Sequence, residues 1–311
     1  MRFFALACAA CVLPSAALAS FDLVFVADVG TDSIHRFDAD SGVYLGSMGA
    51  GALTDPNTLV VDQTNNRLIV GAVNGIFTYD LWTGTMMGYS TITVSNHMTQ
   101  YSAGKYLTSW NGNYSWLGSL TEPVNGYGSS TTVPSSSQWG AITMRSSTNL
   151  LALNSTTGVV YSLLANTFNN PTATLGTYNA TAAGMTGQIA AGFGGFVLAS
   201  GLGNQINYAT FSTSYGSTLI SQSLGEFSTV YGVGFGHNSV YYAAGRNAAN
   251  TSGLLTRRAL GGSSVIGTFG NGILQNPRDI AVIAAPEPGA YVAFGLGLAG
   301  LALRRRRSVK K

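Results

Sequence analysis

The chain is poor in charge and in cysteine. Only 9% of its 311 residues are charged, whereas soluble domains usually carry about 25%. Its two cysteines, Cys8 and Cys11, lie close together near the N-terminus. Everything beyond Cys11 therefore lacks the thiols that disulfides, thiolate metal sites and cysteine nucleophiles require.

The formal charge of +3 comes from the two ends of the chain. Between Ser20 and Ala285 there are 8 Lys and Arg against 11 Asp and Glu, a net charge of about −3. The central part is therefore faintly acidic. Binding to nucleic acid loses its main electrostatic support, and no nucleic-acid partner is expected.

Glycine and apolar residues, in contrast, are abundant. The chain has 40 glycines, 46% hydrophobic residues and 11% aromatic residues. So many apolar residues exclude a disordered chain. Short apolar runs separated by Gly, Asn, Ser and Thr predict many short strands joined by turns.

The first 19 residues have the pattern of a signal peptide. Arg2 precedes an apolar run of 11 residues, Phe3 to Leu13, and Ala17-Leu18-Ala19 supplies a small-residue cleavage site before Ser20. The run is too short to span a bilayer as a mature helix. We therefore expect Sec-type export, with Ala17 and Ala19 defining the cleavage site.

The C-terminus has three parts in a fixed order. A Pro-Glu-Pro motif is followed by uncharged residues up to Leu303 and then by four arginines: Pro286, Glu287, Pro288; Arg304, Arg305, Arg306, Arg307. The 16 uncharged residues from Pro288 would reach about 24 Å as a helix, slightly short of a bilayer core of about 30 Å. This predicts a short transmembrane helix whose arginine end stays in the cytoplasm.

This order of parts resembles the PEP-CTERM sorting signal of Gram-negative bacteria, a tail also named the ice-binding protein C-terminal domain. The resemblance covers residues 285–311. It implies recognition by a membrane exosortase, cleavage near Pro286-Glu287-Pro288, and release to the cell surface or the exopolysaccharide matrix. A plain anchor that is never cut is the alternative.

Residues 20–284 form the remaining domain, and an internal repeat predicts its fold. Candidate inner strands begin near six positions spaced 39 to 47 residues apart: Pro56, Ser95, Gln138, Met185, Val230 and Pro277. Repeats of about 40–50 residues, each with four short strands, are typical of β-propeller blades. The prediction is an all-β, six-bladed β-propeller, with a β-sandwich or a β-solenoid as alternatives.

The two ends of this domain are expected to complete one blade. Residues 277–283 have no strands after them, whereas residues 22–27 and 33–37 have no inner strand before them. One C-terminal and three N-terminal strands would then close the ring and leave no open sheet edge. Residues 22–90 and 265–283 also resemble NHL-type six-bladed propellers.

Residues suited to catalysis are scarce. The chain has three histidines, His35, His97 and His237, and none of them has metal-ligand spacing. His35 is expected to face solvent, and His97 is expected to lie near the channel. The domain has only two glutamates, Glu122 and Glu226, and neither is near a histidine in sequence.

Two glycine-containing turns carry paired carboxylates, Asp28 with Asp32 and Asp38 with Asp40. Calcium prefers several such oxygen ligands, but neither turn has the complete EF-hand pattern. Aspartates in turns commonly bond their own backbone instead. No cofactor is expected, and calcium is the one metal left open.

The candidate binding residues precede the inner strands, where propellers have a channel mouth: Asn57, Asn96, Trp139, Thr186, Tyr231 and Arg278. Aromatic faces beside amide groups suit sugar rings, although the same residues also serve as turn caps. The sequence therefore predicts an exported binding or structural module for exopolysaccharide or protein. An NHL-like lyase or hydrolase with a channel-mouth site is the alternative.

Overall fold

The computed structural model describes the chain in a set of ranges: 22–91, 97–102, 105–110, 113–117, 139–146, 148–164, 173–180, 187–192, 195–210, 212–236, 240–262 and 264–283. The unit Asp22–Ile283 contains all the described strands.

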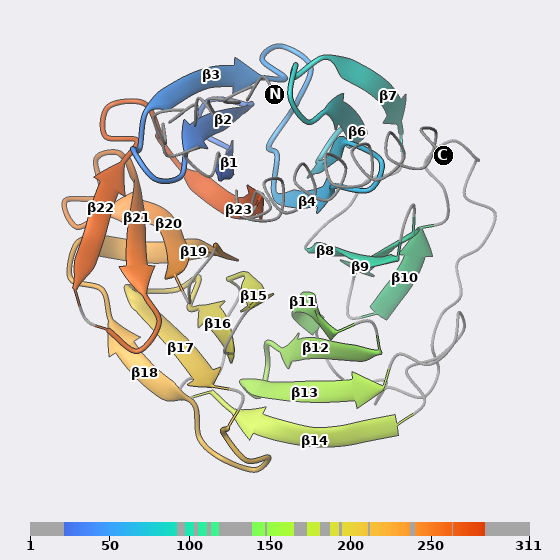
Figure 1. The fold of residues 1–311 in the computed structure, drawn as a ribbon, viewed down its shortest axis with the longest axis vertical. Helices are drawn as coiled ribbons and strands as arrows, with labels where there is room; N and C mark the ends of the chain where they lie inside the picture. Colours follow the sequence, from blue (N-terminus) through green and yellow to red (C-terminus); the bar gives the residue numbers. More distant parts are fainter. Residues whose placement is uncertain are drawn as a thin grey trace, which may run out of the picture. The chain divides into compact units, whose positions relative to one another are not determined.

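Within Asp22–Ile283, separate antiparallel sheets follow one another around a central axis, as in a β-propeller (Figure 1). Five sheets have four strands. From the innermost strand outward they are β23 (Pro277–Ile283), β1 (Leu23–Asp28), β2 (Ser33–Asp38), β3 (Tyr44–Met48); β4 (Thr58–Asp62), β5 (Arg67–Ala72), β6 (Gly75–Asp80), β7 (Met86–Ser90); β11 (Trp139–Ser146), β12 (Asn149–Asn154), β13 (Val159–Leu164), β14 (Ala173–Asn179); β15 (Ile189–Gly192), β16 (Gly195–Ala199), β17 (Gln205–Thr210), β18 (Ile220–Ser223); and β19 (Phe227–Phe235), β20 (Val240–Asn247), β21 (Gly253–Ala259), β22 (Val265–Phe269).

The remaining sheet has three strands, β8 (Met98–Ser102), β9 (Lys105–Trp110) and β10 (Asn113–Leu117). The sequence-based expectation of six four-stranded blades is therefore wrong, because the structure has five. The difference falls beside residues 118–138, which lie outside the described residues. That stretch is rich in Ser, Thr, Gly and Pro and has no alternating apolar pattern from which a strand could be predicted.

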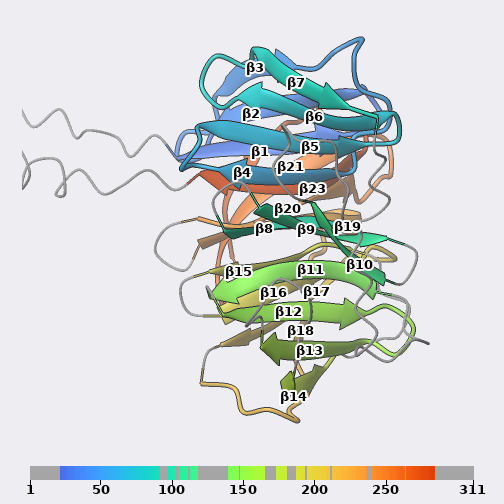
Figure 2. The same ribbon diagram turned by 90° about the vertical axis from the view of Figure 1, so that its right-hand side faces the viewer.

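The predicted ring closure is confirmed. β23 from the C-terminal end pairs with β1, from Leu23 opposite Ile283 to Asp28 opposite Pro277. The Asp28 carboxylate reinforces this junction, because it accepts hydrogen bonds from the backbone N–H of Gln275 at 2.6 Å and of Asn276 at 2.7 Å. The two ends of the unit are therefore joined within one blade (Figure 2).

Apolar clusters fill the spaces between the blades. Phe25, Leu68 and Phe77 belong to one cluster, between the closing blade and β4–β7. Val24 and Tyr242 belong to another, between the closing blade and β19–β22. Second strands such as β1 and β5 are buried on both faces, so they read as continuous apolar runs rather than as alternating patterns.

No helix in the described ranges is long and apolar enough to cross a membrane. The transmembrane helix predicted from Pro288 to Leu303 lies outside those ranges, as do the signal-peptide residues Ala17 and Ala19.

The turn between β2 and β3 provides a test of blade packing. Gly42 has a φ of +73°, and an added Cβ would lie 2.0 Å from the Phe269 ring of the neighbouring blade. We expect Gly42→Ala to lower the free energy of unfolding by about 3 kcal/mol, from left-handed strain and overpacking together. Urea unfolding of the exported protein measures the change.

Gly51 is the matched control, because its φ is +77° but an added Cβ would meet nothing within 4 Å. Gly51→Ala should cost only the strain, about 1 kcal/mol. Equal losses in the two variants would show that the Phe269 contact does not hold the blades together.

Candidate functional site

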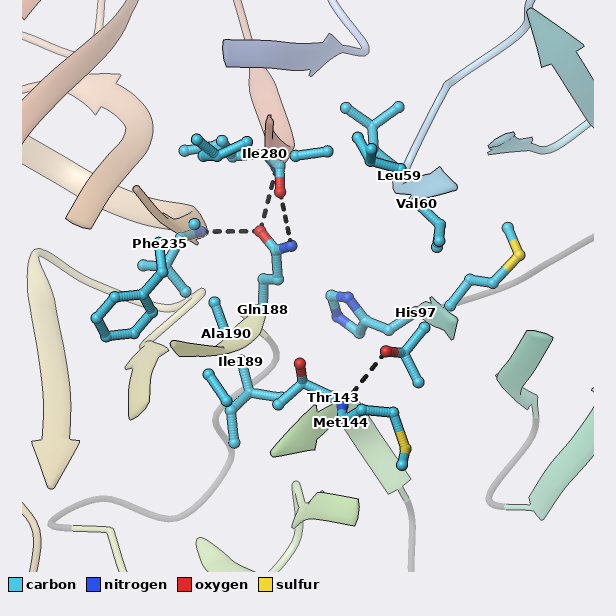
Figure 3. A pocket seen from close by; sticks show the side chains of 18 of the residues that line it. Leu59, Val60, His97, Thr143, Met144, Gln188, Ile189, Ala190, Phe235 and Ile280 are labelled. Atoms are coloured by element: carbon cyan, nitrogen blue, oxygen red, sulfur yellow. Dashed lines mark hydrogen bonds between the residues drawn. The ribbon is translucent and has the colours of Figure 1, made fainter. Parts of the chain in front are cut away.

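A cavity of about 300 Å³ lies where the innermost strands meet. Its walls come from β4, β8, β11, β15, β19 and β23, each contributing three residues, with His97 just before β8 and Gln188 just before β15. Most of the residues that line it are apolar, including Ile189 and Phe235, although polar groups make up more of its exposed wall (Figure 3). We call this cavity the central channel.

Side chains connect the inner strands to one another. Adjacent blades share no backbone ladder, so the inward backbone groups need other partners. Asp279 on β23 accepts a hydrogen bond from Leu59 N on β4 at 2.7 Å, and Thr58 Oγ1 on β4 accepts one from Met98 N on β8 at 2.9 Å. Thr99 continues the series to β11, accepting from Met144 N at 3.3 Å.

Gln188 connects the other side of the ring. Its Oε1 accepts hydrogen bonds from Val233 N at 2.8 Å and Ile280 N at 3.1 Å, and its Nε2 donates to Ile280 O at 3.0 Å (Figure 3). One amide thus ties β19 to β23 from the start of β15. We call Asp279, Thr58, Thr99 and Gln188 the inner ring.

The inner ring was not predicted from the sequence, although the repeat contains part of its signal. Thr58 and Asp279 each stand two residues after a proline, at Pro56 and Pro277, and both directly precede an apolar run. A polar residue at the same position in two repeats, just before a buried strand, indicates a structural hydrogen bond. Thr99 and Gln188 have no such proline before them.

Asp279 is buried at 1% exposure. Burial raises the pKa of its carboxyl to about 8, even though hydrogen bonds from Leu59 N, Ile280 N and the Thr58 side chain act to lower it. The folded protein therefore keeps this proton up to a pH at which an unfolded aspartic acid has long lost it.

His97 is the titratable side chain among the residues that line the channel, and its imidazole points into the cavity. This agrees with the expected position near the channel. The rest of the polar lining consists of the neutral side chains of Thr99, Gln100, Thr143 and Gln188. The cavity therefore suits an uncharged ligand with hydroxyl or amide groups.

His35 was expected to face solvent, and this is wrong. It is only 5% exposed, with Nε2 2.9 Å from Thr31 Oγ1 and Nδ1 3.2 Å from Tyr44 Oη. Burial lowers the pKa of His35, while the Asp28 carboxylate at 3.8 Å opposes that change. Alternation along the strand could not reveal this, because both faces of a middle strand are covered. His237 lies outside the described residues.

Three of the six predicted channel-mouth residues can be placed with their side chains. Asn57, Tyr231 and Arg278 each stand two residues before the first channel-lining residue of their strand. The Arg278 guanidinium lies 4.0 Å from the centre of the Tyr231 ring, a cation–π contact between β19 and β23. Asn96, Thr186 and the Trp139 side chain lie outside what is described.

The carboxylates of the two candidate calcium turns already have protein partners, some within the turn and some on other elements. Besides its two bonds to the loop before β23, Asp28 accepts one from Gly30 N at 2.9 Å. Asp38 Oδ1 accepts bonds from Ser41 N at 2.7 Å and Ser41 Oγ at 2.6 Å. Across the described residues, no group of three or more His, Cys, Asp or Glu could hold a metal ion.

Residues 284–307 match the PEP-CTERM protein-sorting motif. The tail is a sorting signal. It indicates that the chain is exported to the cell envelope and processed by an exosortase. No curated protein matches the chain in sequence.

Solved structures support the propeller fold. A chain from a nidogen/laminin complex is similar with a TM-score of 0.59 at 10% identity, over 86% of this chain and 99% of that one. A protein of unknown function from Bacteroides caccae gives 0.61 at 13%, over 85% and 99%. The β-propeller domain of Cps50 (Swd1) from Myceliophteria thermophila gives 0.54 at 12%, over 85% and 92%. These likenesses show the fold alone.

Because of Asp279, the stability of the folded protein should depend on pH. The pKa of Asp279 is about 8 in the folded protein, against an ordinary value of 3.8, so its contribution to stability is complete below pH 4. That contribution is lost as the pH rises from 4 to 8, because only the unfolded state releases the proton there. Asp279→Asn should remove this downward slope, and urea unfolding midpoints at several pH values would measure it.

Asp55→Asn is the control for this experiment. Asp55 is exposed, and its positive φ of 47° is one that asparagine also adopts. The change of its urea unfolding midpoint with pH should match that of the unmodified protein. An Asp279→Asn slope that also matches would contradict the assignment of a proton to this buried carboxyl.

Proposed function

We propose that the protein is a surface-displayed, non-enzymatic binding module whose propeller holds a neutral glycan of the exopolysaccharide matrix at the mouth of the central channel. The observation that carries the proposal is the sorting motif, which begins at residue 284, directly after the closing strand β23. A folded domain with this sorting signal reaches the cell envelope, where polysaccharide is available as a ligand.

We further propose that the three-stranded sheet β8–β10 completes the ring between the blade that begins with β4 and the blade that begins with β11. In support, β8 lines the channel beside β4 and β11 and is hydrogen-bonded to both through Thr58 and Thr99. Tyr106 on β9 also donates a 2.7 Å hydrogen bond to Asp62 on β4, which anchors this sheet to its neighbour.

The chemistry of the channel and its mouth supports a neutral glycan. Thr143, one of the polar lining groups, is uncharged and can bond sugar hydroxyls. At the mouth, the Tyr231 ring orients the Arg278 guanidinium, which supplies fixed N–H donors. A lyase or hydrolase would need an acid and a base, and among the described residues that line the channel His97 is the one ionisable side chain.

Arg278 allows a direct test of glycan binding. Loss of its hydrogen bonds to a bound sugar should weaken binding about 10-fold, since a bond to a charged group contributes roughly 1.5 kcal/mol or more. Retention of the exported protein on exopolysaccharide purified from its own cells would compare Arg278→Ala with the unmodified protein.

Arg246→Ala is the control, because Arg246 lies at the end of β20 and its guanidinium donates to Asn250 O in the turn that follows. It should bind as the unmodified protein does. The proposal fails if the unmodified protein is not retained or if both variants bind equally. Unsaturated or new reducing sugar ends appearing in the incubated polysaccharide would instead support the lyase or hydrolase.

The sorting proposal has its own test in the mass of the mature protein. We expect an N-terminus at Ser20 and a C-terminus between Ala285 and Gly289. Replacing Arg304, Arg305, Arg306 and Arg307 with alanine should leave the C-terminus intact and the protein in the membrane fraction.

Lys310→Ala combined with Lys311→Ala is the control, because both lysines lie beyond the matched residues 284–307. This variant should be processed normally. Surface protein that still carries its arginines would contradict exosortase cleavage.

A further inference from the structure

The outer strands of four blades share one irregularity. In β3, β7, β14 and β22, the pairing with the preceding strand shifts by one residue just before a glycine. The extra residue is Leu45, Met87, Leu175 or Ile266, followed by Gly46, Gly88, Gly176 or Gly267. Each is therefore a β-bulge that presents one large apolar side chain on the circumference.

These apolar side chains are open to solvent. Leu45 is 43% exposed, Met87 53% and Ile266 52%. Three blades that follow one another around the ring, ending in β22, β3 and β7 (Figure 1), add further exposed apolar residues beside the bulges. We call the whole set the apolar rim: Val43, Tyr44, Leu45, Trp82, Met86, Met87, Tyr89, Val265 and Ile266.

Two arginines make the rim continuous between blades. Arg36 on β2 donates to Trp82 O in the β6–β7 turn at 2.8 Å and contacts Leu45 O at 3.4 Å. Arg257 on β21 reaches the β2–β3 turn in the same way, pairing with Asp40 at 2.8 Å. The guanidinium groups thus fill the grooves between the outer strands.

The size of the rim matches a protein interface. Nine large side chains of roughly 200 Å² each, about half exposed, present on the order of 800 Å² of apolar surface. Each partner in a stable complex contributes about this area, whereas the largest apolar patch on a monomer is usually about 300–600 Å².

The scarcity of charge on the rim strands favours a second copy of this protein as the partner that covers the rim. The domain carries a net charge of about −3, so two copies repel each other over most of their surface. β3, β7 and β22 contain no charged residue. Of the two arginines between them, Arg257 is paired with Asp40 and Arg36 donates to backbone carbonyls. The rim can therefore face itself with less of that repulsion than the rest of the surface. The bulges also interrupt the strand edges, which disfavours open-ended strand addition and favours side-chain packing.

We infer that the protein forms a symmetric dimer in which the apolar rim of one copy packs against the apolar rim of the other. In such an isologous contact one patch serves both partners. The assembly stops at two copies, because each buries the surface that recruits the other.

Sedimentation equilibrium of the protein recovered from the surface of cells that express the full chain tests this inference. The unmodified protein should be a dimer with a Kd of about 1 µM or tighter, as expected for an interface of this size. The double variant Leu45→Asp with Met87→Asp should dissociate at least 100-fold more readily, because two carboxylates would be buried in each half of the interface.

Leu175→Asp with Leu202→Asp is the matched control. It adds the same charge at two exposed apolar positions, 42% and 67% exposed, on other blades. It should remain dimeric, and near-ultraviolet circular dichroism should show that both double variants are folded. A monomeric unmodified protein, an unchanged rim variant, or a control that dissociates equally would each overturn the inference. The inference would also be overturned if the unmodified protein were a monomer and the rim variant differed from it only in weaker retention on polysaccharide.

Discussion

The inner ring of side-chain hydrogen bonds is the constraint on which the propeller depends. Blades of a propeller are separate sheets, so the inward edges of their first strands have no neighbouring ladder. Asp279, Thr58, Thr99 and Gln188 supply the partners for these buried N–H groups. Unsatisfied, each such group would cost about 1–3 kcal/mol. The same side chains fix the spacing of the inner strands and hence the width of the channel.

The periodic features of the fold could be predicted from the sequence, because they repeat. Turn residues and apolar runs at spacings of 39 to 47 residues located every inner strand, and the strand left over at each end implied that β23 pairs with β1. The three-stranded sheet escaped prediction because residues 118–138 lack the alternating pattern. His35 was misjudged because alternation reports burial on one face of a strand, whereas a propeller blade is covered on both.

The candidate site was less predictable, because its geometry comes from residues distant in sequence. The position of Arg278 followed from the repeat, but its stacking on Tyr231 depends on how β19 lies beside β23. Gln188 bonds residues 45 and 92 positions away, and no local pattern encodes that. The bulges of the apolar rim arise from register shifts, which the strand sequences alone do not reveal.

The pairing of β1 with β23 also sets the order of events during export. Asp28 lies near the start of the domain. The backbone N–H of Gln275, which donates to the Asp28 carboxylate, follows 247 residues later. Until that last strand has crossed the membrane, β1 has an open edge and the ring has a gap. Closure of the ring therefore depends on β23, the strand that directly precedes the sorting motif in the sequence. A chain that ended before Pro277 would lack β23 and leave the edge of β1 unpaired.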